Sequence, residues 1–135
     1  MAGSKTDAFE SRLIDHLFKG GATPALAALS TVYVALYTSV PSDTSAGTEV
    51  AGSSYARQAV AASGWTHTPG SNTVTNAAEV AFAAVTAAPY TVVGWAICDA
   101  ASGGNQLYWG DCPSTAMNVG DIPRFAPGAL TITED

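Results

Sequence analysis

The stretch from Thr91 to Asp111 constrains the fold more than any other part of the chain, because its pattern predicts one β-hairpin. Its two arms consist of β-branched and aromatic residues, which fit a pleated, half-buried surface. The arm residues are Val92, Val93, Trp95, Ile97, Leu107, Tyr108 and Trp109. Between the arms, Asp99 to Asn105 is rich in Asp, Ser, Gly and Asn, which form turns through side-chain hydrogen bonds and positive φ angles. We therefore expect an antiparallel pair at the centre of the fold, with Trp95 in the core.

Other short segments predict further strands on both sides of the hairpin. Thr31 to Thr38 is apolar or aromatic at nearly every position, as is typical of a strand buried on both faces. Tyr55 to Ala61 predicts a second strand, in which Arg57 and Gln58 are polar. Thr73 to Asn76 and Glu79 to Val85 together predict one or two further strands. Gly128 to Glu134 predicts a short terminal strand with Leu130 and Ile132 inward.

Turn and loop residues separate these strands. Val40 to Ser54 is predicted to be a long polar loop, and loops of this length in compact domains are usually functional. Gly64 to Asn72 predicts a turn region anchored by Trp65. The two Gly-Asp-x-Pro sequences that start at Gly110 and Gly120 predict a turn or a sheet edge. A calcium site at their aspartates is disfavoured because no carboxylate cluster accompanies them.

Asp7 to Lys19 is the one predicted helix of substantial length. Thr6 or Asp7 can cap its start, and Gly20 follows its end. Its apolar stripe consists of Phe9, Leu13, Ile14, Leu17 and Phe18. Two placements are open, because the stripe can lie on the domain's own sheet, which we favour, or dock on a neighbouring subunit. Residues 22–30 predict either a linker or a single helical turn.

One helix followed by about six to eight short strands indicates a mainly β fold. We expect an antiparallel β-sandwich or barrel, a jelly-roll arrangement included, with one N-terminal amphipathic helix. The expected organisation is an N-terminal helical segment at residues 1–21 and a single β domain at residues 22–135. A chain of 135 residues is long enough for one domain with a hydrophobic core.

The charge pattern excludes one class of partner. In residues 1–20, three Lys or Arg residues balance three Asp or Glu residues. The rest of the chain holds Arg57 and Arg124 against eight carboxylates, which accounts for the net charge of −6. Such an acidic body has no electrostatic footprint for phosphate, so direct nucleic-acid binding is not expected. Only 12% of the residues are charged, and a charge-poor surface is easily buried against a protein partner.

Membrane insertion and secretion are also not expected. The charge-free run from Val80 to Cys98 is nearly long enough to span a bilayer, but Pro89 interrupts it with a turn. Residues 1–19 carry charges throughout and lack the apolar region of a secretory signal. Cys98 and Cys112 lie about five residues out of register in the hairpin, on the order of 16 Å apart, so we expect two unlinked thiols.

No catalytic or metal-binding pattern emerges. The chain lacks the H-E-x-x-H, G-x-S-x-G and P-loop motifs, and its two histidines have no ligand spacing. We expect neither an enzyme nor a cofactor or metal site. Trp65, Tyr108 and neighbouring aromatic residues are candidates for a sugar-stacking platform, although packing inside the fold is the more common role of such side chains.

Four motifs in a fixed order resemble a family of small virion proteins of tailed bacteriophages, often labelled tail fibre protein. They are LYT-x-x-P-S-D from Leu36, G-T-E-V from Gly47, S-Y-A-R-Q from Ser54, and D-A-A-S-G-G-N-x-L-Y-W-G from Asp99. Each motif alone is weak, but the combination is specific and the resemblance covers nearly the whole chain. A compact domain of this length is too short for a fibre shaft, so the label is not taken literally.

The resemblance implies a non-enzymatic structural protein of the virion, assembled in the bacterial host cytoplasm. We expect a capsid decoration (cement) protein that bridges capsid subunits. Its partners would be the major capsid protein or neighbouring virion proteins and further copies of itself. The alternative is a tail or baseplate component that acts as a receptor- or carbohydrate-binding module. The candidate interface residues are Phe9, Leu13, Leu17, Arg57, Trp65, Tyr108 and Arg124.

Overall fold

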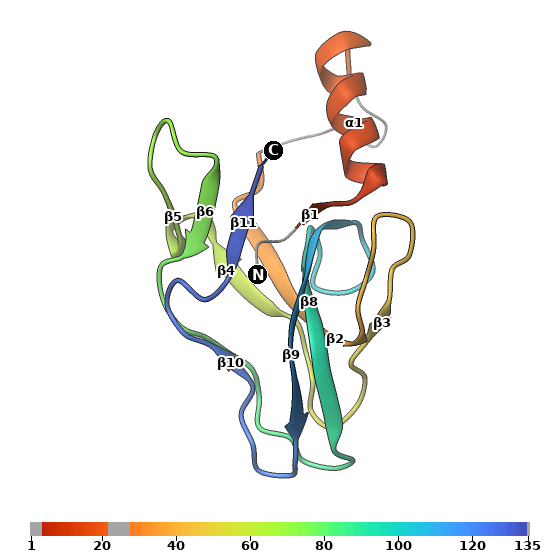
Figure 1. The fold of residues 1–135 in the computed structure, drawn as a ribbon, viewed down its shortest axis with the longest axis vertical. Helices are drawn as coiled ribbons and strands as arrows, with labels where there is room; N and C mark the ends of the chain where they lie inside the picture. Colours follow the sequence, from red (N-terminus) through yellow and green to blue (C-terminus); the bar gives the residue numbers. More distant parts are fainter. Residues whose placement is uncertain (1–3, 22–27, 135) are drawn as a thin grey trace.

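The computed structural model describes residues 4–21 and 28–134, and Figure 1 shows how their elements are arranged. Most of the predicted linker or helical turn at residues 22–30 lies outside the described residues. The elements are β1 Ser4–Lys5, α1 Asp7–Phe18, β2 Thr31–Ser39, β3 Thr48–Glu49, β4 Gln58–Ala61, the 3₁₀ turn Ala62–Gly64, β5 Trp65–His67, β6 Thr73–Asn76, β7 Val80–Ala81, β8 Tyr90–Cys98, β9 Gln106–Met117, β10 Arg124–Phe125 and β11 Thr131–Thr133.

Every strand pair in the described residues is antiparallel, which confirms the predicted fold class. The largest sheet has six strands in the order β1-β9-β8-β2-β3, and β4 pairs with β2 on the same edge as β3. A three-stranded sheet, β11-β6-β5, and a two-stranded ribbon, β10-β7, complete the body. The expected terminal strand is β11, and its neighbourhood buries Leu130 and Ile132 as predicted.

The main core lies between the six-stranded sheet and the two smaller sheets. The large sheet contributes Leu36, Trp95 and Ile97, and the smaller sheets and their flanks contribute Phe82 and Leu130. Trp95 is buried, which confirms its predicted place. A Cβ atom at Gly110 would lie 2.5 Å from the Trp95 ring, so only glycine fits beneath this indole.

A smaller cluster covers the opposite face of the same sheet. It consists of buried Ala35, Tyr37, Ala96 and Cys98, with Trp109 packed against them. Because β2 contributes residues of both parities to these two clusters, its middle is buried on both sides, as its sequence predicts. The loops after β2 and β8 lie along this second face. The first loop leads into the G-T-E-V motif, and the second contains the glycines of the D-A-A-S-G-G-N-x-L-Y-W-G motif.

The hairpin of β8 and β9 is longer than its sequence predicts. Gly94 pairs with Asp111 and Val92 pairs with Thr115, so the register shifts by two residues between them. Residues 110–113 form no turn but continue as strand β9 beyond its pairing with β1 at Tyr108 and Trp109, so of the two expected alternatives the sheet edge is the one observed. Pro113 is tolerated since an irregularity in the ladder does not require its missing N–H. The second Gly-Asp-x-Pro sequence does form a turn, in which the Asp121 carboxylate accepts the Asn118 N–H at 2.9 Å.

Both cysteines are free thiols, as predicted from the hairpin register. Cys98 pairs with Gln106, which places it six residues out of register with Cys112. Burial raises the pKa of the Cys98 thiol to about 11. The thiol therefore stays protonated near neutral pH and acts as a small apolar side chain of the second cluster.

Several short strands differ from their predicted bounds. The loop at residues 40–54 contains β3, because buried Val50 fixes the chain against β2 through its N–H bond to the Leu36 carbonyl. The strand predicted from Tyr55 begins only at Gln58. The predicted turn at residues 64–72 contains β5, which pairs with β6. The strand expected at residues 79–85 is reduced to β7, because the chain then bonds to the irregular segment before β10.

Helix α1 stands at one end of the molecule (Figure 1). The two residues before it form β1, which pairs with β9 through Ser4 opposite Trp109 and Lys5 opposite Tyr108. No residue of α1 is fully buried. The favoured expectation that the apolar stripe lies on the domain's own sheet holds for half-buried Phe9 and Leu13 and fails for Ile14, Leu17 and Phe18, which are exposed. The division into segments 1–21 and 22–135 stays a prediction.

Candidate functional site: a clamped loop face and a projecting helix

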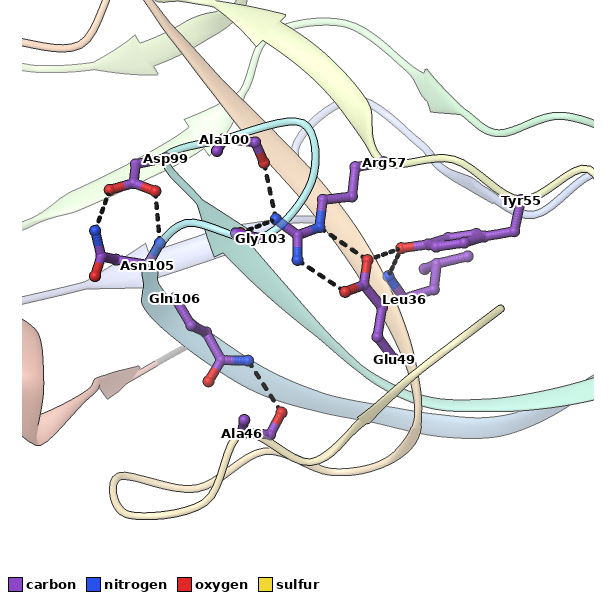
Figure 2. Close-up of polar contacts among 10 residues, drawn as sticks. All are labelled: Leu36, Ala46, Glu49, Tyr55, Arg57, Asp99, Ala100, Gly103, Asn105 and Gln106. Carbon is purple, nitrogen blue, oxygen red and sulfur yellow. Dashed lines mark hydrogen bonds and ion pairs between the residues drawn. The ribbon is translucent and has the colours of Figure 1, made fainter. Parts of the chain in front are cut away.

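The guanidinium of Arg57 joins two distant parts of the chain, and Figure 2 shows its contacts. Its Nε and Nη2 donate to the two carboxylate oxygens of Glu49, each at 2.8 Å. Its Nη1 donates to the carbonyls of Ala100 at 2.8 Å and Gly103 at 2.9 Å. We call Glu49, Arg57 and the two carbonyls the loop clamp, since they fasten the β8–β9 loop to β3.

Tyr55 extends the loop clamp into the sheet. Its hydroxyl donates to Glu49 Oε1 at 2.9 Å and accepts the Leu36 N–H at 3.0 Å. Its ring stacks on Phe82 with centroids 6.0 Å apart. Burial strongly raises the pKa of this phenol, so it remains a donor to Glu49 across the physiological range. One side chain thus connects the loop clamp to β2 and to the main core.

The β8–β9 loop is closed by its own side chains, as its composition predicts. The Asp99 carboxylate accepts the backbone N–H of Asn105 at 2.6 Å and its side-chain N–H at 2.7 Å. Gly104 has φ +69°, and a Cβ atom there would lie 2.4 Å from Asp99 Oδ1. The turn therefore needs glycine for both its backbone angle and its space. The result is a loop whose shape is fixed from within and then held by Arg57.

The electrostatics of the loop clamp favour both charged forms. The hydrogen bonds from Arg57 hold the pKa of Glu49 below its ordinary value, against the opposing effect of burial. The same bonds raise the pKa of Arg57. The Arg57 side chain is only 9% exposed, so its charge is balanced inside the fold. This internal role of a predicted interface residue was not anticipated from the sequence.

A hollow of about 310 Å³ opens beside the loop clamp. Tyr37, Glu49, Arg57 and Gln106 lie along it, and Gln106 Nε2 donates to the Ala46 carbonyl at 3.3 Å. Burial raises the pKa of Tyr37 to about 12, which keeps this phenol protonated near neutral pH. The polar side chains along this hollow are engaged in hydrogen bonds within the chain, so they hold the loops around it in place. None of them is an activated nucleophile.

The second feature is the attachment of α1. The Thr6 hydroxyl caps the helix by accepting the Phe9 N–H at 3.3 Å, and it donates to the Gln106 carbonyl at 2.9 Å. The Thr6 N–H donates to the Leu107 carbonyl at 3.0 Å. The Phe9 ring meets the Tyr108 ring edge-on with centroids 5.5 Å apart. The start of the helix is therefore held by its cap, its backbone and one aromatic contact.

Strand β1 and the segment after β11 meet beside this attachment. Glu134 forms an ion pair with Lys5 of β1 and accepts a hydrogen bond from the Tyr108 hydroxyl. Burial raises the pKa of the Glu134 carboxyl, and these hydrogen bonds more than offset this effect, so its pKa lies below the ordinary value. The contact fixes the segment that leads into α1.

Four of the predicted interface residues gather under α1. Phe9, Leu13, Trp65 and Tyr108 all line a largely apolar hollow of about 570 Å³ between the helix and the body. The indole N–H of Trp65 is buried and has no hydrogen-bond partner within the described residues. The hollow leaves the helix incompletely packed against its own body.

Leu17, the fifth predicted interface residue in this region, lies one turn beyond Leu13 toward the C-terminal end of α1. It is 64% exposed, and its neighbours Ile14 and Phe18 are 57% and 78% exposed. We call these three residues the open helix face. They are the largest apolar side chains that the final turns of α1 present to solvent, and they were all part of the predicted stripe.

Arg124 is remote from both features. It lies on β10, where its Nη1 is 3.7 Å from a carboxylate oxygen of Glu79, and both side chains are about half exposed. An ion pair of this length and exposure contributes little to stability. The structure therefore does not bring Arg57 and Arg124 together into one basic contact.

Two negative observations apply to the described part of the chain. No three His, Cys, Asp or Glu side chains at residues 4–21 and 28–134 are grouped so that they could hold a metal ion. No helix in these same segments is long and apolar enough to cross a bilayer.

One sequence family matches residues 4–133, and its description is "Podophage GP4 fiber I protein gp80". The chain belongs to this family. It is thus a fibre-type structural protein of a tailed-phage virion, in agreement with the resemblance inferred from the four motifs. A search of curated proteins found no match.

Three of these motifs, two of them close together and the third more than 40 residues further along, meet at the loop clamp. G-T-E-V supplies Glu49, S-Y-A-R-Q supplies Tyr55 and Arg57, and the hairpin motif supplies the Ala100 and Gly103 carbonyls. The sequence held one signal for this pairing. Glu49 and Arg57 are the only Asp, Glu, Lys or Arg residues between Asp43 and Glu79, so each is the nearest available partner of the other.

Proposed function

We propose that this protein is a non-catalytic subunit of a virion fibre, with α1 at the assembly contact and the β body as the outward part. One observation carries the proposal: a helix whose apolar side chains at Ile14, Leu17 and Phe18 are 57%, 64% and 78% exposed projects from one end of the β body. The family description as a fibre protein supports an appendage. We place this appendage at the tail or baseplate.

The loop clamp suits a receptor-binding part of such a fibre. Loops that carry binding residues work best when a rigid scaffold holds them, because little ordering entropy is then lost on binding. Arg57 and Asp99 fix the β8–β9 loop in this way. We therefore propose that the loop face, and not the region of Trp65 and Tyr108 under α1, contacts a receptor or carbohydrate on the host surface.

Capsid decoration is the second candidate. The low share of charged residues favours it, because a decoration protein buries uncharged surface across neighbouring capsid subunits. In this case the partners would be the major capsid protein or neighbouring virion proteins. The sequence favours decoration, whereas the family description as a fibre favours the appendage, which we therefore rank first.

Quantifying this protein in purified virions tests the two candidates. A fibre subunit is expected at about a dozen copies per particle or fewer, and a decoration protein at on the order of hundreds, because tail and capsid symmetries differ. Gold-labelled antibody should bind the tail end of the particle. Labelling spread over the head, together with binding of the purified protein to undecorated shells, would overturn the fibre role in favour of decoration.

Host-cell binding tests the receptor part of the proposal. Purified protein should bind intact host cells and compete with the phage for adsorption. An exposed substitution on the β8–β9 loop, such as Ser102→Arg, should abolish both effects. The matched substitution Ser114→Arg on β9 should leave them intact. Equal binding by both variants would show that the receptor contact lies elsewhere.

A further inference from the structure

The apolar stripe of α1 is too wide for one contact surface. With 3.6 residues per turn, Phe9 and Phe18 lie about 180° apart around the helix axis. The body reaches one edge of this arc, where Phe9 and Leu13 are half-buried, and leaves the other edge to solvent. A helix that serves a single core needs an arc of only about 100°. Ile14 and Phe18 lie on the remaining arc, and Leu17 lies one turn beyond Leu13, past the part of the helix that the body reaches. Together they form the open helix face, which a second apolar partner would cover.

Among the described residues, the far end of the helix is closed by backbone hydrogen bonds from Lys19 and Gly21 to the Asp15 carbonyl, and no buried side chain packs there. A helix of 12 residues is marginal by itself in water, so its last turns depend on packing. The cap, the β1 pairing and the Phe9–Tyr108 contact all act at its first turn. A partner that covers Ile14, Leu17 and Phe18 would supply the missing packing.

The charge distribution identifies the partner that fits. Residues 1–20 are neutral, with charges of both signs, whereas the rest of the chain carries −6. Copies of this chain would therefore repel through their bodies and approach without net repulsion through their helices. The final turns of α1 are the part farthest along the helix from the β1 attachment, so contact there keeps the acidic bodies apart (Figure 1).

We propose that copies of this chain associate side by side through the open helix face, with Ile14, Leu17 and Phe18 of each copy packed against those of the next. This inference rests on the proposed fibre role and names its assembly contact. Three side chains per copy form a small interface, so the assembly is weak and depends on each of them. The contact gives the fibre a helical base from which the β bodies project.

Sedimentation velocity over a concentration series tests the self-association. The wild-type chain should form a reversible homo-oligomer at micromolar concentrations. The double substitution Leu17→Gln and Phe18→Gln should raise the dissociation constant by at least about a hundredfold, since each buried side chain of this size contributes about tenfold or more. Far-UV circular dichroism should still show the β body, because both side chains are exposed in the single chain.

A matched control uses apolar side chains at the other end of the molecule. Val119 and Ile122, in the segment between β9 and β10, are 60% and 43% exposed. The double substitution Val119→Gln and Ile122→Gln should leave the dissociation constant within about twofold. Equal weakening by both double substitutions would overturn the assignment to the helix, because it would show a general effect of surface hydrophobicity.

Cross-linking places the contact directly. A Phe18→Cys chain should form an intermolecular disulfide under mild oxidation, whereas Val119→Cys should not. A wild-type chain that is monomeric throughout the series would overturn this inference, and so would an oligomer that the helix substitutions leave intact. Either result leaves the fibre role standing if the virion copy number and tail labelling agree with it, so the two failures are distinguishable.

Discussion

The loop clamp and the open helix face are both joined to β9, yet they differ in what they leave unpaired. At the loop clamp, Glu49 and the carbonyls of the β8–β9 loop satisfy the Arg57 guanidinium inside the chain. On α1, the side chains of Leu17 and Phe18 are largely exposed. A buried charge must be satisfied internally, whereas exposed apolar side chains gain most from a partner. The first region therefore stabilises the single chain, and the second directs its assembly.

The largest expected effect lies in the core that supports both regions. Trp95→Ala should lower the free energy of unfolding by about 3–5 kcal/mol, because it leaves a cavity in the main core between the six-stranded sheet and the two smaller sheets. Urea denaturation of the wild type and the variant gives this value. A change below about 1 kcal/mol would contradict the central role of the β8–β9 hairpin.

Breaking the loop clamp should have the next largest effect. Glu49→Gln removes the charge that balances Arg57 and should lower the free energy of unfolding by about 1.5–3 kcal/mol. The control is Glu79→Gln, which breaks the half-exposed pair with Arg124 and should cost no more than about 0.5 kcal/mol. Equal effects in urea denaturation would show that the loop clamp is no more than a surface ion pair.

The pH dependence of stability sharpens this result. Because the folded-state pKa of Glu49 lies below the unfolded one, its contribution is fully present above the ordinary carboxyl range and is lost as pH falls through the depressed value. The free energy of unfolding of the wild type should therefore fall more between about pH 5 and pH 2 than that of Glu49→Gln. Parallel curves would indicate that Glu49 titrates normally.

A smaller effect is expected at the start of α1. Thr6→Ala removes the helix cap and the bond to the Gln106 carbonyl, and it should destabilise the first turn by about 1 kcal/mol. Hydrogen exchange should become faster at the Phe9 and Glu10 amides, which bond to Thr6. Thr6→Ser keeps both functions of the hydroxyl and should restore the slow exchange. No change in Thr6→Ala would show that the helix is held elsewhere.

The smallest effect on the single chain should come from the open helix face. Phe18→Ser should change the free energy of unfolding by no more than about 0.5 kcal/mol at concentrations where the protein is monomeric, because the ring is exposed. A loss above about 2 kcal/mol would mean that Phe18 packs on its own body. This variant therefore tests directly whether the two regions differ in the way described.

The sequence by itself determined the elements whose signals are local. The apolar stripe and Thr6 marked α1, the alternation of β-branched and aromatic residues marked the hairpin, and Asp99 with Asn105 marked its loop. Buried Trp95 and the register of Cys98 followed from the same pattern. These features depend on residues within a few turns or strand lengths of one another, so a single stretch of sequence contains their cause.

Only the tertiary structure decided the short strands, the loop clamp and the reach of α1. β3, β5 and β7 have two or three residues each, and what makes them strands is their pairing with another segment, which is nearby in the sequence for β3 and β5 and distant for β7. Arg57 was polar in a predicted strand, but its bonds to residues more than 40 positions away gave it an internal role. The apolar stripe of α1 predicted that the helix is buried, but it did not specify which surface buries it. Its width exceeds what one body covers, because an apolar arc of about 180° faces two directions at once.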